Sequence, residues 1–198
     1  MTDAATTAEP TYLGLLNAIS LAESAAGAYL EAWAAATPIP DLAGVLRLVA
    51  ARETSHGEVF RRRIAELGFE LRRKPDPRAA ERHAKLADPR IADIDKIPAR
   101  GSEDADPFAD IRRRMAEGEF DAMTANLMNW YIAEEKDSAR RLSEAYDCVR
   151  EAAGRGRRAS GVGEAAQPSA DAEAIMACMT AGFARLEKAM EKLAKARK

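Results

Sequence analysis

Two helices and the turn between them are encoded in residues 21–56, LAESAAGAYLEAWAAATPIPDLAGVLRLVAARETSH. The part before the prolines belongs to an apolar pattern over residues 12–36 that repeats every three or four residues, as on one face of a helix. The run Thr37-Pro38-Ile39-Pro40 ends this helix, because proline lacks a backbone donor, and the same period resumes over 42–67. Two long helices joined by so short a loop are expected to lie antiparallel.

Three ionisable residues interrupt the apolar faces of this predicted hairpin: Glu23 in the first helix, and Glu53 and His56 in the second. Glu53 and His56 are three residues apart, so both project from one side of the helix. Glu23 precedes Thr37 by 14 residues and Glu53 follows Asp41 by 12, which predicts similar heights in an antiparallel pair. A buried carboxylate costs several kcal/mol unless a cation, a metal ion or a proton compensates for it. These residues are therefore candidate ligands of a cation.

Oxygen ligands combined with one imidazole suit iron or manganese better than structural zinc. Glu23 and the motif Glu53-Thr54-Ser55-His56 resemble the first half of the ferritin-like di-metal carboxylate proteins, with a spacing most similar to the rubrerythrin group. The resemblance spans residues 12–153 and implies an antiparallel four-helix bundle with a long crossover, which here corresponds to residues 69–106. It also implies that Glu23 and Glu53 are carboxylate ligands and that His56 is the nitrogen ligand.

The second half of the family's site is not repeated in this chain. An internal offset of 96 residues matches the first carboxylate to Glu119, which the resemblance implies as a bridging metal ligand. The same offset puts Val149 and Ala152 where a second Glu-x-x-His would stand. Glu134 and Glu135 do not restore the motif, because no histidine follows three residues later.

Three arrangements of the site remain open at this stage. A single iron or manganese ion could occupy a reduced site completed by water. Two chains could each contribute half of a paired site. Alternatively, the site could be a relic in which Glu53 and His56 form a hydrogen bond with each other.

The helices of the second half are less clearly delimited. A third helix is predicted from Pro107, and a break near Asp137-Ser138 would start a fourth, although one continuous helix over 107–153 stays open. In the continuous case the terminal helix could take the fourth place in the bundle. The inward face of the third helix is predicted to carry Phe108, Ile111, Met115, Glu119, Ala122, Asn126 and Trp130.

The chain divides into a bundle over 1–153, a flexible linker over 154–170 and an amphipathic C-terminal helix over 171–198. The linker is rich in glycine, serine and alanine and lacks an apolar period. Lysines crowd the polar face of the last helix. This helix is expected to pack on the bundle or to bind a protein partner.

Composition limits the class of protein. Thirty basic against 32 acidic residues leave a net charge of −2 in 198 residues, so no bulk positive charge favours nucleic acid or a membrane surface. Abundant alanine and a 6% share of aromatic residues favour helices over strands. Two cysteines are too few for a disulfide framework. No phosphate-binding glycine loop or nucleophile elbow occurs, and we expect a cytoplasmic protein.

The sequence thus predicts an all-α, ferritin-like antiparallel four-helix bundle with an extra C-terminal helix. The resemblance implies a protein that binds iron or manganese and acts as an oxidoreductase on oxygen or peroxide. The alternative is a non-enzymatic helical interaction or scaffold module with a relic site. A homo-oligomer such as a dimer is expected, without nucleic acid or membrane as partners.

Overall fold

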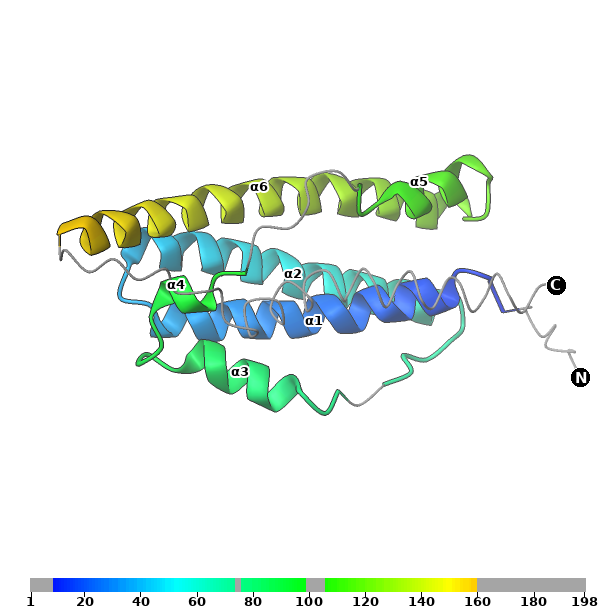
Figure 1. Ribbon diagram of the computed structural model, residues 1–198. Coiled ribbons are helices and arrows are strands. Elements are labelled where there is room, and N and C mark those ends of the chain that lie inside the picture. Colours follow the sequence, from blue (N-terminus) through cyan, green and yellow to red (C-terminus); the bar gives the residue numbers. More distant parts are fainter. Residues whose placement is uncertain (1–8, 74–75, 99–105, 160–198) are drawn as a thin grey trace, which may run out of the picture.

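The computed structural model describes residues 9–73, 76–98 and 106–159. Its helices are, in chain order, α1 (Leu13–Ala36), α2 (Pro40–Glu66), α3 (Ala79–Ala87), α4 (Asp93–Lys96), α5 (Ala109–Ala116) and α6 (Ala122–Ala159). These three ranges contain no strand, so the predicted all-α class is confirmed. Figure 1 shows the three long helices, α1, α2 and α6, lying alongside one another.

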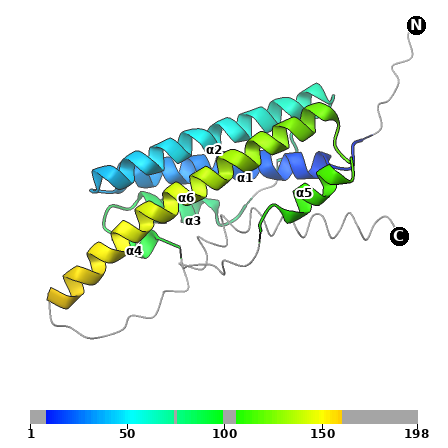
Figure 2. The same ribbon diagram turned by 90° about the horizontal axis from the view of Figure 1, so that it is seen from above.

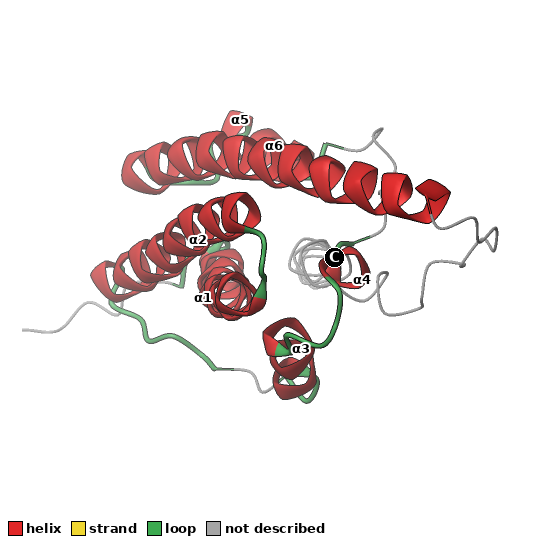
Figure 3. Cartoon of the chain, turned by 90° about the vertical axis from the view of Figure 1, so that its left-hand side faces the viewer, coloured by secondary structure: helices red, strands yellow, loops and turns green. Residues whose placement is uncertain are grey.

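The helices α1 and α2 form the predicted hairpin and lie side by side over their lengths (Figures 1 and 3). Two glycines allow this close approach. A Cβ atom on Gly27 would lie 3.0 Å from the carbonyl oxygen of Ala50, and one on Gly57 would lie 3.0 Å from the backbone nitrogen of Ser24. Since such distances are shorter than ordinary carbon contacts, larger residues at these positions would push the helices apart.

The long helix α6 runs along α2 and crosses it obliquely, as seen from above in Figure 2. The break predicted near Asp137-Ser138 is wrong, because α6 continues through both residues. The continuous helix over 107–153 is also wrong, since α5 ends at Ala116. The break lies instead around Gly118, which has a φ of +71°. Asp121 then caps α6, its Oδ1 accepting hydrogen bonds from the backbone nitrogens two and three residues later.

The described residues of the crossover between α2 and α5 contain two short helices, α3 and α4. Figure 3 shows α3 against α1, on the side away from α6. The start of α4 is tied to the end of α1, because Trp33 Nε1 donates to Asp93 Oδ1 at 2.7 Å and Thr37 Oγ1 donates to Asp93 Oδ2 at 2.6 Å. These bonds hold the crossover at the closed end of the hairpin.

The linker expected over 154–170 begins inside α6, which extends to Ala159. The rest of that segment, and the amphipathic helix expected over 171–198, lie outside the described residues. Among the described residues, three long helices account for the bundle.

Within the described ranges, the core consists of two apolar clusters, one toward each end of the long helices. The first cluster includes Leu16, Phe60, Ile111, Met128 and Tyr131. The second includes Leu30, Trp33, Leu46, Leu142 and Tyr146. Between the two clusters, each long helix carries polar residues that are buried or half-buried: Glu23 on α1, Glu53 and His56 on α2, and Glu135 on α6. These residues form the candidate site.

By length and hydropathy, α1 would be long enough to cross a membrane. Half of its most apolar window is buried inside the fold, and a core helix gives the same signal. The feature therefore carries no weight for cellular location.

Candidate metal centre

Four side chains from the three long helices meet between the two apolar clusters: Glu23 from α1, Glu53 and His56 from α2, and Glu135 from α6. Each offers one ligand atom, and these four atoms lie within 4.8 Å of one another. The exposed fractions of Glu23, Glu53 and His56 are 7%, 3% and 0%. Metal–oxygen bonds of about 2.0–2.2 Å place opposite ligands about 4–4.4 Å apart, so the spacing is close to that of the ligands of one ion.

His56 faces carboxylates through both ring nitrogens. Its Nδ1 lies 3.1 Å from Glu135 Oε1 and 3.7 Å from Glu53 Oε2, while its Nε2 lies 3.0 Å from Glu134 Oε2. Despite the short distance, Nδ1 and Glu135 Oε1 make no hydrogen bond, and both atoms are buried. The separation of 3.7 Å also exceeds a hydrogen bond, so Glu53 and His56 are not bonded directly as the relic arrangement supposes.

The carboxylate of Glu23 and the ring of His56 are both held by aromatic residues of α6. Tyr131 donates its hydroxyl hydrogen to Glu23 Oε1 at 2.7 Å. The rings of Trp130 and Tyr131 contact the His56 ring edge to face, with centroids 4.9 and 5.2 Å away. These contacts leave the imidazole little freedom to tilt.

Burial and mutual repulsion raise the pKa values of the buried acids. Burial raises the pKa of Glu23 well above its usual range, and the nearby Glu53 and Glu135 raise it further. For Glu53, burial raises the pKa to about 7, against an opposing effect of Glu23. Burial alone would lower the pKa of His56, but Glu135 and Glu134 outweigh it and raise that pKa. Without a cation, the cluster therefore retains protons at neutral pH.

The local sequence brings the two hairpin carboxylates together. Each is followed four residues later by one of the glycines that let α1 and α2 approach: Gly27 after Glu23 and Gly57 after Glu53. Residues four apart lie on the same side of a helix. The close contact between the helices is therefore one helical turn from each carboxylate.

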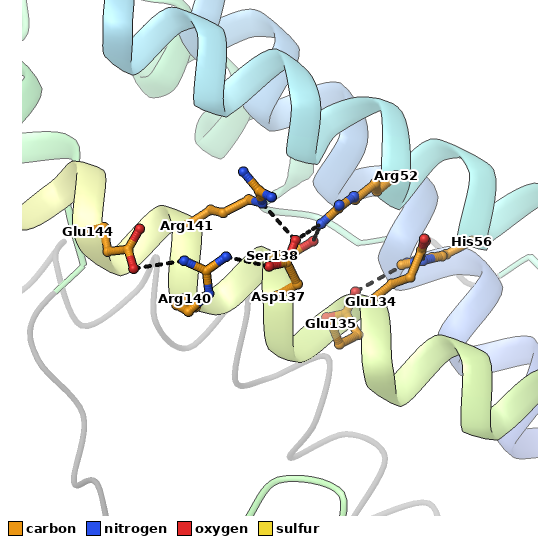
Figure 4. A network of polar contacts seen from close by, with 9 residues as sticks. All are labelled: Arg52, His56, Glu134, Glu135, Asp137, Ser138, Arg140, Arg141 and Glu144. Atoms are coloured by element: carbon orange, nitrogen blue, oxygen red, sulfur yellow. Dashed lines mark hydrogen bonds and ion pairs between the residues drawn. The ribbon is translucent and has the colours of Figure 1, made fainter.

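An ion-pair network next to the cluster links α2 to α6 (Figure 4). Arg52 Nη1 donates to Asp137 Oδ2 at 2.8 Å, and Asp137 also accepts hydrogen bonds from Arg140 and Arg141. Arg52 immediately precedes Glu53, and its positive charge lowers the pKa of that carboxyl. The network thus holds the two helices together beside the ligand atoms.

Of the residues that the sequence singles out, Glu23, Glu53 and His56 lie together in the cluster. Glu119 does not. It lies in the connection between α5 and α6, where it accepts a hydrogen bond from Arg114 Nε at 2.8 Å. Its carboxylate neutralises a buried guanidinium, which gives it a structural role in place of the predicted ligand role.

Sequence reasoning missed Glu135 and Glu134, because it looked for a second Glu-x-x-His and because the third helix was predicted to run without interruption from Pro107 at least as far as Asp137. A signal for Glu135 does exist in the sequence. It lies four residues after Tyr131 and seven before Leu142, which is helical spacing on the buried face of α6. Searching for a carboxylate within that stripe, without requiring a histidine, finds it.

Comparison with family models, with curated proteins and with solved structures gives no match to this chain. What can be said of its chemistry therefore depends on the four clustered side chains and their neighbours.

Proposed function

We propose that this chain is a ferritin-like metal-binding protein that holds one iron or manganese ion between Glu23, Glu53, His56 and Glu135. The observation that carries the proposal is the pair of buried atoms, His56 Nδ1 and Glu135 Oε1, which face each other at 3.1 Å without a hydrogen bond. Leaving such a group unsatisfied costs about 1–3 kcal/mol. An ion bound by both atoms would remove this cost.

The donor set supports the choice of metal. Three carboxylates and one imidazole are ligands that suit iron or manganese, whereas structural zinc favours thiolates and several histidines. The tautomer also fits, because a proton on Nε2 next to Glu134 leaves the Nδ1 lone pair directed at the cluster. Metal-binding histidines commonly donate their second N–H to a carboxylate in this way.

The ferritin-like assignment is supported by the helices that provide the ligands. One carboxylate from the first helix, a Glu-x-x-His from the second and a carboxylate from a later long helix follow the order that the resemblance implies. The described residues bring one imidazole to the cluster. We therefore propose one ion in place of the family's pair.

When bound, iron or manganese would supply the electron transfer of an oxidoreductase that handles oxygen or peroxide. The residues of the chain hold the ligands and manage protons. Tyr131 fixes one oxygen of Glu23. The raised pKa values of Glu23 and Glu53 mean that a divalent cation displaces protons when it binds.

Metal analysis of protein purified without chelator tests the proposal. Wild type should contain roughly one ion per chain, while Glu53→Ala, His56→Ala and Glu135→Ala should contain almost none. Glu144→Ala is the matched control, because it removes an exposed carboxylate of α6 that lies outside the cluster and pairs with Arg140, and this variant should retain the metal. A negligible metal content per chain in all five proteins would refute metal binding.

The alternative is a helical interaction module with a relic site, and one observation favours it. Met123 and Trp130 are seven residues apart on α6, and their exposed fractions are 65% and 37%. Because residues seven apart lie on the same side of a helix, these two side chains offer apolar surface on one face to a protein partner. Trivial metal content, together with a Met123→Ser change that alters the oligomer size in solution, would favour this function.

A further inference from the structure

Glu134 lies next to the proposed ligands without being one of them. Its Oε2 atom is 3.0 Å from Nε2 of His56, whereas Nδ1 of the same ring faces the cluster, 3.1 Å from Glu135. Consecutive residues of a helix point about 100° apart. Accordingly, Glu135 is directed inward with a side chain 13% exposed, and Glu134 stays at the boundary with 33% exposed.

We infer that Glu134 is a positioning residue, which holds His56 in the Nε2–H tautomer and thereby keeps the Nδ1 lone pair directed at the metal site. This inference rests on the proposed function. A neutral imidazole has one N–H, and an ionised carboxylate only accepts hydrogen bonds. The 3.0 Å contact therefore places the proton on Nε2, which leaves Nδ1 as the atom that can bind a cation.

The other contacts of the His56 ring do not select between its two tautomers. Trp130 and Tyr131 meet the imidazole edge to face, with ring planes at 87° and 86°. They restrict the tilt of the ring but offer no acceptor to either nitrogen. Among the described residues, the acceptor opposite Nε2 is Glu134. On the other side, Nδ1 and the facing Oε1 of Glu135 share no hydrogen bond.

The affinity of the full-length protein for Mn²⁺ provides the first test. Glu134→Ala should weaken binding by about 10–100-fold, the usual effect of removing a partner of this kind. Glu134→Gln keeps a carbonyl acceptor for the Nε2–H and should lose clearly less affinity for Mn²⁺ than Glu134→Ala. The control is Glu144→Ala on the same helix, which removes an exposed carboxylate paired with Arg140 at 2.8 Å and should bind Mn²⁺ like wild type.

The tautomer of His56 in the metal-free protein provides a second readout, which a merely structural role would not change. The chain has two histidines, so nitrogen NMR of the imidazoles is assigned with the help of a His83→Ala variant. Recorded above the titration of His56, the wild type and Glu134→Gln should carry the proton on Nε2, and Glu134→Ala should show a mixture of tautomers. Circular dichroism melting confirms that each variant is folded.

Two results would overturn the inference: a proton on Nδ1 in the wild type, or a Glu134→Ala variant that binds Mn²⁺ as tightly as wild type. Failure of the proposed function looks different. If no protein in the set binds Mn²⁺, the metal site is refuted, while the NMR spectra still decide whether Glu134 selects the tautomer.

Discussion

Replacing Gly57 by alanine should lower the stability of the protein relative to the same replacement at Gly44. A Cβ atom on Gly57 would lie 3.0 Å from the backbone nitrogen of Ser24 and 3.1 Å from the carbonyl oxygen of Ser20. Both atoms belong to the backbone of α1, so they cannot rotate away. At Gly44, which is also in α2, a Cβ atom would meet nothing within 4 Å.

The expected changes in the free energy of unfolding follow from two opposing effects. Replacing a helical glycine by alanine gains about 1 kcal/mol in either position. Overpacking of a helix contact costs about 1–3 kcal/mol, and this cost applies to Gly57 alone. We therefore expect Gly44→Ala to be more stable than wild type by about 1 kcal/mol, and Gly57→Ala to be less stable than Gly44→Ala by about 1–3 kcal/mol.

Urea unfolding of both variants, followed by far-UV circular dichroism, measures the difference. Gly57 follows His56 directly, and moving α2 away from α1 would separate Glu23 from Glu53. Mn²⁺ affinity should thus fall in Gly57→Ala and stay unchanged in Gly44→Ala. Equal gains in stability from both substitutions would show that α1 and α2 are not in close contact at Gly57. The close placement of Glu23 and Glu53 in the cluster would then be wrong.

Three further predictions concern the charges and hydrogen bonds around the cluster. For the metal-free protein, the folded-state pKa of Glu53, about 7, is above its ordinary value of 4.5, so the folded state binds more protons than the unfolded state. The corresponding stabilisation is complete below about pH 4.5 and is lost as the pH rises through 7; it amounts to roughly 3 kcal/mol, at about 1.4 kcal/mol per pKa unit. Melting temperatures should therefore fall between about pH 5 and pH 8. A rise in melting temperature over this range would contradict the burial of Glu53. Tyr131→Phe removes the 2.7 Å hydrogen bond to Glu23 and should cost about 1–3 kcal/mol in urea unfolding; an unchanged unfolding curve would exclude this bond. Arg52→Ala breaks a partly exposed ion pair with Asp137 and should lower the free energy of unfolding by only about 0.5–1 kcal/mol. It should also raise the titration midpoint of Glu53 in carboxyl NMR, because the guanidinium lowers that pKa. A lower midpoint would contradict this expectation.

The orientation of α6 shows where sequence reasoning goes wrong. A continuous helix from Pro107 predicts that Trp130 points inward, yet Trp130 is 37% exposed and the neighbouring Tyr131 is 1% exposed. Gly118, with φ at +71°, ends the preceding helix, and α6 starts afresh after Asp121. Restarting a helix changes which residues face the core. The buried stripe of α6 therefore passes through Tyr131 and Glu135. Glu119, which the sequence predicted as a metal ligand, pairs with Arg114 in the connection between α5 and α6 instead.

The local sequence was sufficient to predict the hairpin and the shared height of Glu23, Glu53 and His56. Helical periodicity and a proline turn act over a few residues, and the length of each helix from the turn sets the register between them. The partners that complete the site, Glu135 and Glu134, were decided only by tertiary structure. Their positions depend on how α6 packs against α2 some 80 residues away in the chain, and that packing is governed by the burial of side chains from all three helices.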